Sequence, residues 1–198
     1  MSDPISQAGF RSAARFVALA NLAYFGVEFS VALAIGSVSL FADSVDFLED
    51  ASVNFLILAA LGWGLRARAR IGMALAGLLL VPGIATLWTA IEKFLTPSIP
   101  APVPLSLTGL GALVVNLTCA FVLARHRDHH GSLSKAAFLS ARNDAIANVA
   151  IVAAGLATAL SRSIWPDLLV GLGIAIMNLD AAREVWETAR GEHLVAEP

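Results

Sequence analysis

The chain has 198 residues, of which 58% are hydrophobic and only 14% are charged, with a mean hydropathy of +0.76 and a net charge of −2. A soluble domain is about 25% charged, so this composition excludes an ordinary soluble domain and predicts a membrane protein. The single cysteine, Cys119, excludes a disulfide framework and a cysteine-rich metal site, and the sequence carries no signal for nucleic-acid binding.

Six apolar segments follow one another along the chain. Each is long enough to cross a hydrocarbon core of about 30 Å, which takes about 20 helical residues, and strands are not expected because an open sheet edge cannot face lipid. We therefore predict an all-α membrane protein: a bundle of six transmembrane helices forming one domain over residues 12–188, between tails at 1–11 and 189–198. The predicted helices span residues 12–34, 37–64, 71–93, 104–125, 135–160 and 164–188.

The basic residues are unevenly distributed over the predicted loops. If both termini face the cytoplasm, only Lys93 and Arg162 lie outside, and Arg142 falls within the fifth helix. Cytoplasmic loops carry an excess of lysine and arginine, so we predict that both termini are cytoplasmic. The basic residues on the inner side are then Arg11, Arg15, Arg66, Arg68, Arg70, Arg125, Arg127, Lys135, Arg183 and Arg190.

The second predicted helix contains four carboxylates, in the stretch FADSVDFLEDASVNFL: Asp43, Asp46, Glu49 and Asp50. An acid at the centre of a membrane helix costs about 2.5–3.5 kcal/mol, so such residues are functional candidates by default. Asp46 and Asp50 are four residues apart and share one helix face, with Asp43 nearly in line. Carboxylates at this spacing repel one another unless a cation or a proton lies between them.

The fifth predicted helix carries a matching polar stripe. Ser140, Asp144 and Asn148 follow at four-residue spacing, with Asn143 beside them, and all offer oxygen ligands. At about 1.5 Å per residue, Asp50 and Asp144 both fall in the middle to inner half of the membrane, so we expect them to meet.

The acids of the predicted helices far outnumber the bases. Between their terminal turns, the first, second and fifth predicted helices carry Arg142 as their single base, and this excess of negative charge favours a path for a divalent cation and argues against an anion. The acids in these parts of the three helices are Glu28, Asp43, Asp46, Glu49, Asp50 and Asp144.

Several of these polar residues also have structural interpretations. Asp43 is either an acid on the outer path or a cap of the second helix, and Glu49 is either on the path or an ion-pair partner of Arg142. The histidines of the loop RHRDHHGS either set topology or capture metal from the cytoplasm. These histidines are His126, His129 and His130, and the residues expected to form interhelical hydrogen bonds are Asn21, Asn116 and Asn178.

Two stretches, GSVSLFADSVDFLEDA and SARNDAIANVAIVAAG, together resemble the cation diffusion facilitator family of divalent metal transporters. WPDLLVGLGIAI and the histidine-bearing loop are similar to that family as well, so the resemblance covers about residues 12–188. The family carries ligand pairs four residues apart on its second and fifth helices. The resemblance implies that the metal ligands here are Asp46, Asp50, Ser140 and Asp144.

The chain departs from the family pattern in two respects. Members usually carry a cytoplasmic ferredoxin-like domain after the sixth helix, so we expect a short form whose homodimer would rest on the membrane helices. Many zinc-transporting members have a histidine in place of Ser140, which implies that Asn143, Asn148 or a water completes the site. Such an oxygen-rich set widens the choice of metal to Zn²⁺, Mn²⁺, Fe²⁺, Co²⁺ or Cd²⁺.

We predict a secondary transporter, not an enzyme, which exports a divalent cation from the cytoplasm of a bacterium across its inner membrane in exchange for protons. The metal is cargo, and no permanent cofactor is expected. Because no G-x-x-x-x-G-K-[ST] motif occurs, the energy must come from an ion gradient. Two alternatives stay open: an intramembrane hydrolase with Asp50 and Asp144 as acid and base, and a membrane subunit that binds metal without transporting it.

Overall fold

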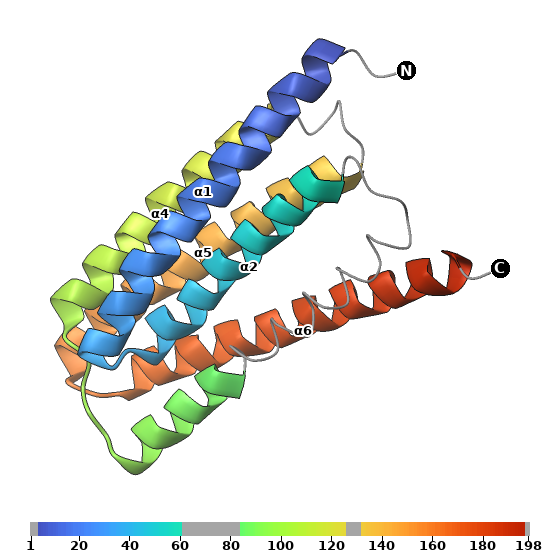
Figure 1. The fold of residues 1–198 in the computed structure, drawn as a ribbon. Coiled ribbons are helices and arrows are strands. Elements are labelled where there is room, and N and C mark those ends of the chain that lie inside the picture. The colour runs from blue at the N-terminus through green and yellow to red at the C-terminus, as the bar shows by residue number, and fades with distance from the viewer. Residues whose placement is uncertain (1–3, 61–83, 126–131, 197–198) are drawn as a thin grey trace.

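The computed structural model describes residues 4–60, 84–125 and 132–196, and within these ranges all regular structure is helical. Figure 1 shows long helices that lie side by side, as the hydropathy pattern predicts. The helices are α1 (Pro4–Ile35), α2 (Val38–Ala60), a helical segment at 84–95, α4 (Pro102–Ala124), α5 (Ser132–Ser161) and α6 (Trp165–Ala196).

The helix boundaries follow local backbone chemistry. Gly36 adopts a positive φ of 63°, and the amide of Ser37 donates to Ala32 O at 3.0 Å, which closes α1 with a left-handed glycine cap. Ser37 then caps α2, because its Oγ accepts from the Leu40 amide at 3.2 Å. Pro102 stands in the first turn of α4, where its missing N–H does no harm.

Two helices extend beyond the apolar segments that predicted them. α1 already begins at Pro4, and α6 continues to Ala196, so residues 189–196 of the predicted tail are helical. Hydropathy marks only the part of a helix that suits lipid, whereas polar residues such as glutamate and arginine can prolong the same helix into water.

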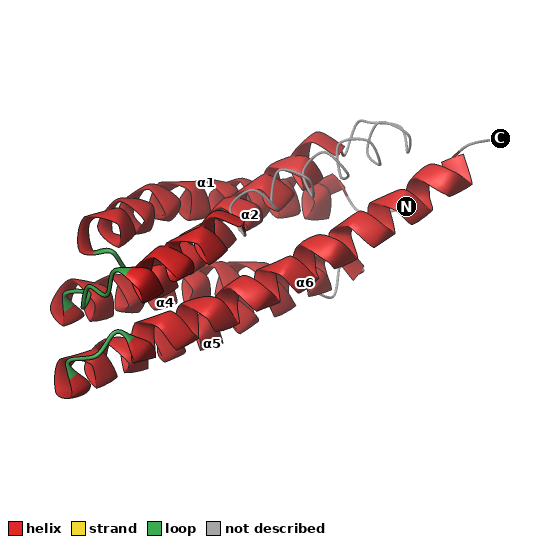
Figure 2. Cartoon of the chain, turned by 90° about the horizontal axis from the view of Figure 1, so that it is seen from below, coloured by secondary structure: helices red, strands yellow, loops and turns green. Residues whose placement is uncertain are grey.

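α2 lies at the centre of the bundle, since it contacts α1, α4, α5 and α6. Figures 1 and 2 show that the free ends of α1 and α6 lie at one end of the bundle, and the α1–α2 and α5–α6 turns lie at the other. The central position of α2 places its four acids where the other helices can surround them.

The distribution of polar and apolar side chains is that of a membrane protein. The exposed face of α4 is lined by large apolar residues, while the buried polar side chains include carboxylates and amides. Among the residues that the structure describes, three segments are long and apolar enough to cross a membrane: Gly9–Ile35, Pro102–Ala124 and Asp144–Ser161. The exposed apolar residues of α4 are Val103, Leu107, Leu110, Val114, Leu117 and Phe121.

Gly171 of α6 lies directly against the backbone of α2. A Cβ added there would lie 2.7 Å from the Ser39 amide nitrogen and 2.7 Å from the Val38 carbonyl carbon, so Gly171→Ala must push the two helices apart. We expect a loss of about 1–3 kcal/mol in stability, measured as a lower midpoint of thermal unfolding in detergent. Gly173→Ala is the matched control, because a Cβ there meets nothing within 4 Å. Equal midpoints for the two variants would contradict this close contact.

Candidate metal site

Asp50 of α2 and Asp144 of α5 come together, as their similar depth along the two helices predicted. The Asp144 carboxyl group interacts with Asp50, which lies within hydrogen-bond range, and also with Asp43 and Glu49. Asp46 has Asp144 as its strongest charged neighbour. All these charges are negative, so the cluster attracts cations and repels anions.

The described residues do not by themselves form a complete metal site. Among their His, Cys, Asp and Glu side chains, no group of three or more is arranged to hold one ion. Ser140 and Asn143 belong to α5, but their side chains lie outside the described part of the chain. The same holds for the side chain of Arg142, so the alternative of an ion pair between Glu49 and Arg142 lies outside the described residues. The histidines of the loop at 125–132, namely His126, His129 and His130, also lie outside the described residues.

Asn21 of α1 holds Asp50 in place. Its Nδ2 donates to Asp50 Oδ2 at 3.3 Å, and its Oδ1 faces the Cys119 thiol at 3.7 Å. Asn21 is fully buried, so a well-packed amide fixes one carboxylate of the site. This contact confirms the prediction that Asn21 forms hydrogen bonds between helices.

Asp43 is bound by a chain of two amides. Asn148 Nδ2 donates to Asp43 Oδ2 at 2.5 Å, and Asn116 Nδ2 donates to Asn148 Oδ1 at 2.9 Å. This chain of hydrogen bonds runs from α4 through α5 to α2. Asn148, a candidate additional metal ligand, therefore lies against Asp43. The interpretation of Asp43 as a helix cap is wrong, because α2 begins at Val38, five residues before Asp43, and Ser37 caps it.

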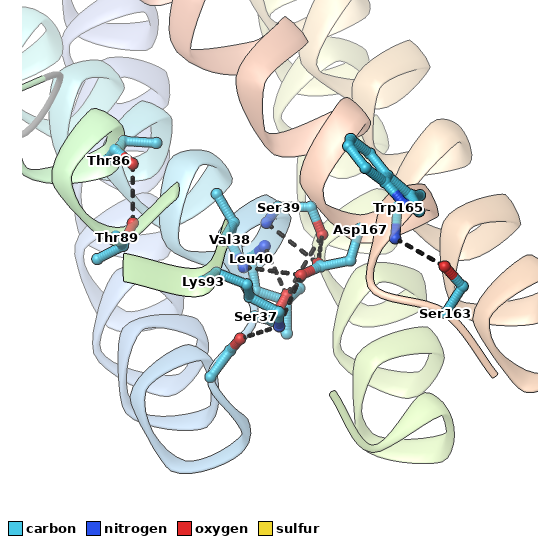
Figure 3. A network of polar contacts seen from close by, with 11 residues as sticks. Ser37, Val38, Ser39, Leu40, Thr86, Thr89, Lys93, Ser163, Trp165 and Asp167 are labelled. Atoms are coloured by element: carbon cyan, nitrogen blue, oxygen red, sulfur yellow. Dashed lines mark hydrogen bonds and ion pairs between the residues drawn. The ribbon is translucent and has the colours of Figure 1, made fainter. Parts of the chain in front are cut away.

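A second polar centre lies at the α1–α2 turn, around Asp167 of α6 (Figure 3). Asp167 Oδ1 accepts from the hydroxyls of Ser37 and Ser39, each at 2.6 Å, and from the Ser39 amide at 3.2 Å. Its Oδ2 accepts from the Val38 amide at 3.0 Å. Asp167 therefore joins the first turn of α6 to the first turn of α2.

Lys93 completes this centre with a buried ion pair. Its Nζ lies 3.2 Å from Asp167 Oδ2 and also donates to Gly36 O. The side chains are 4% and 0% exposed. Sequence patterns did not reveal this pair: Lys93 was assigned to the outer loop charges, and its partner lies 74 positions further along the chain. The one local sequence signal for this polar centre is Ser37 and Ser39 after Gly36, since serine favours the start of a helix.

Comparison with known proteins adds one match. The family model described as the cation efflux transmembrane domain matches residues 14–190, which covers every helix that contributes to the site. No curated protein matches the chain.

Proposed function

Because the chain belongs to the cation efflux family, we propose that it exports a divalent metal cation from the cytoplasm in exchange for protons. Family membership makes the chain a membrane transporter of cations rather than an enzyme. The alternative of an intramembrane hydrolase is therefore excluded, and the resemblance seen in the sequence is confirmed.

The observation that supports a metal cargo best is the meeting of Asp144 of α5 with Asp46 and Asp50 of α2. Like charges this close, inside a bundle, need protons or a cation between them. We propose these three carboxylates as metal ligands, together with Ser140, and with Asn143 or a water to complete the set. Oxygen ligands of this kind suit Mn²⁺, Fe²⁺, Co²⁺, Zn²⁺ or Cd²⁺.

The same carboxylates couple metal to protons in this proposal. When deprotonated and open to the cytoplasm they bind metal, and after the helices rock to open the site outward, protons displace it. Asn21 acts as a positioning residue, since its amide orients Asp50 without contacting the cargo.

The membrane setting completes the proposal. The split of basic residues supports cytoplasmic termini, and we propose a bacterial inner membrane as the setting. The apolar outer face of α4 supports contact with lipid or with a second copy in a homodimer.

Purified chain in liposomes tests the exchange directly. With an acidic lumen and a neutral exterior, we expect Zn²⁺ or Mn²⁺ to accumulate inside as protons leave, reported by a metal-sensitive dye in the lumen. Collapse of the pH gradient with a protonophore and nigericin should stop accumulation. Metal uptake at the same rate with and without the pH gradient would exclude proton exchange. Binding of metal without any flux would instead identify a non-transporting subunit.

A further inference from the structure

Glu28 of α1 is a buried acid that the proposed metal site does not use. Its side chain is 0% exposed, and neither Oε1 nor Oε2 has a hydrogen-bond donor. It points at Asp43 of α2, whose carboxyl group lies within hydrogen-bond range. Asp43 is equally buried, and its Oδ1 also lacks a donor. Three carboxylate oxygens from two adjacent helices thus receive no hydrogen bond from any other described residue.

Neighbouring groups hold Asp43 toward Glu28 without neutralising either acid. Asn148 occupies only Oδ2 of Asp43, and Asn116 in turn fixes Asn148. Amide donors orient a carboxylate but carry no charge, and a buried carboxylate without a cation is costly. Tyr24, one turn before Glu28, directs its hydroxyl away, to Thr108 O at 2.6 Å. The pair is therefore positioned for a ligand that brings positive charge.

This pair lies nearer to the α1–α2 turn than the two α2 acids of the proposed site. Asp43 precedes Asp46 by three residues and Asp50 by seven, or about 4.5 Å and about 10 Å along the helix at 1.5 Å per residue. At that end of the bundle a cavity of about 250 Å³ is lined by Ala32, one turn beyond Glu28 on α1, and by Phe41 of α2. The two acids thus lie between the deeper carboxylates and this cavity.

We propose that Glu28 and Asp43 form a second binding position for the divalent cargo, occupied between the deeper site and the end that holds the α1–α2 turn. The proposal rests on the proposed transport function. Carboxylate oxygens with no competing donor are ligands for Mn²⁺, Zn²⁺ and similar ions. A second position along the path gives the ion a place to stop after it leaves the first, and like charges on two adjacent ions assist release.

Counting bound Mn²⁺ tests the proposal. We expect equilibrium dialysis of the purified full chain in detergent at mildly alkaline pH to give two Mn²⁺ ions per chain. Glu28→Gln and Asp43→Asn should each lose one ion, and Asp144→Asn should lose the other. Asp180→Asn, which neutralises an exposed acid of α6, is the matched control and should keep both. Glutamine fills the same space as glutamate and removes an unpartnered buried charge, so Glu28→Gln is expected to fold, as size-exclusion chromatography can check.

The outcomes separate this position from the main site. If Glu28→Gln and Asp43→Asn both still bind two Mn²⁺ ions, the second position is overturned. It is also overturned if the wild type binds a single ion and only Asp144→Asn loses it. Two ions bound with no flux in liposomes would contradict the transport function while supporting this position. A wild type that binds no metal contradicts both.

Discussion

Replacing Asp144 with asparagine is expected to abolish metal transport. Asparagine keeps the shape of aspartate but removes the charge that α5 contributes opposite Asp46 and Asp50. Loss of a residue that merely orients a metal ligand weakens affinity about 10–100-fold, so loss of a ligand charge should reach at least the upper end of that range. The measurement is the initial rate of metal uptake into liposomes with an acidic lumen, beside metal affinity in detergent.

Asp180→Asn is the matched control for this substitution. Asp180 lies on α6 and is exposed, so its neutralisation changes the net charge equally without changing any acid of the cluster. Asn21→Ala should fall between the two, because it frees Asp50 to move but leaves its charge in place. Undiminished uptake by Asp144→Asn, with wild-type elution on size-exclusion chromatography, would remove Asp144 from the transport site.

Replacing Asp167 with alanine is expected to give the largest loss of stability of any single change considered. The substitution deprives Ser37, Ser39 and the Val38 amide of their acceptor and leaves the Lys93 ammonium buried without its counter-ion. Removing one partner of a buried ion pair costs about 3–5 kcal/mol. Thermal unfolding in detergent should show this as a strongly lowered midpoint.

Lys93→Met separates the charge pair from the rest of the network. It removes the ammonium but leaves Asp167 with the Ser37 and Ser39 donors, so the loss should be clearly smaller than for Asp167→Ala. Glu92→Gln changes the exposed neighbour of Lys93 and should stay within about 0.5 kcal/mol of wild type. If Asp167→Ala unfolds at the wild-type temperature, Asp167 does not fasten α6 to the α1–α2 turn.

Much of the site could be predicted because its residues follow helical periodicity. Asp46 and Asp50 share a face for the same reason that any residues four apart do, and an acid in an apolar helix is rare enough to draw attention. The sequence shows both Glu28 and Asp43 as part of the charge excess, but it does not predict that these two acids pair. Which acids of α1 and α2 face each other depends on the rotation of each helix about its own axis. The spacing of residues within one helix does not predict that rotation.

The sequence by itself determined the class of molecule, the helices and the face of α2 that carries charge, because hydropathy, Gly36 and the prolines act on their immediate neighbours. Tertiary structure alone decided the pairings: Lys93 with Asp167, Asn148 with Asp43, and Glu28 with Asp43. Local patterns reflect energies within a few turns of one helix. A contact between residues far apart in the chain depends on the packing of whole helices. Because α2 contacts α1, α4, α5 and α6, the packing of these four helices around it decides which residues its acids meet.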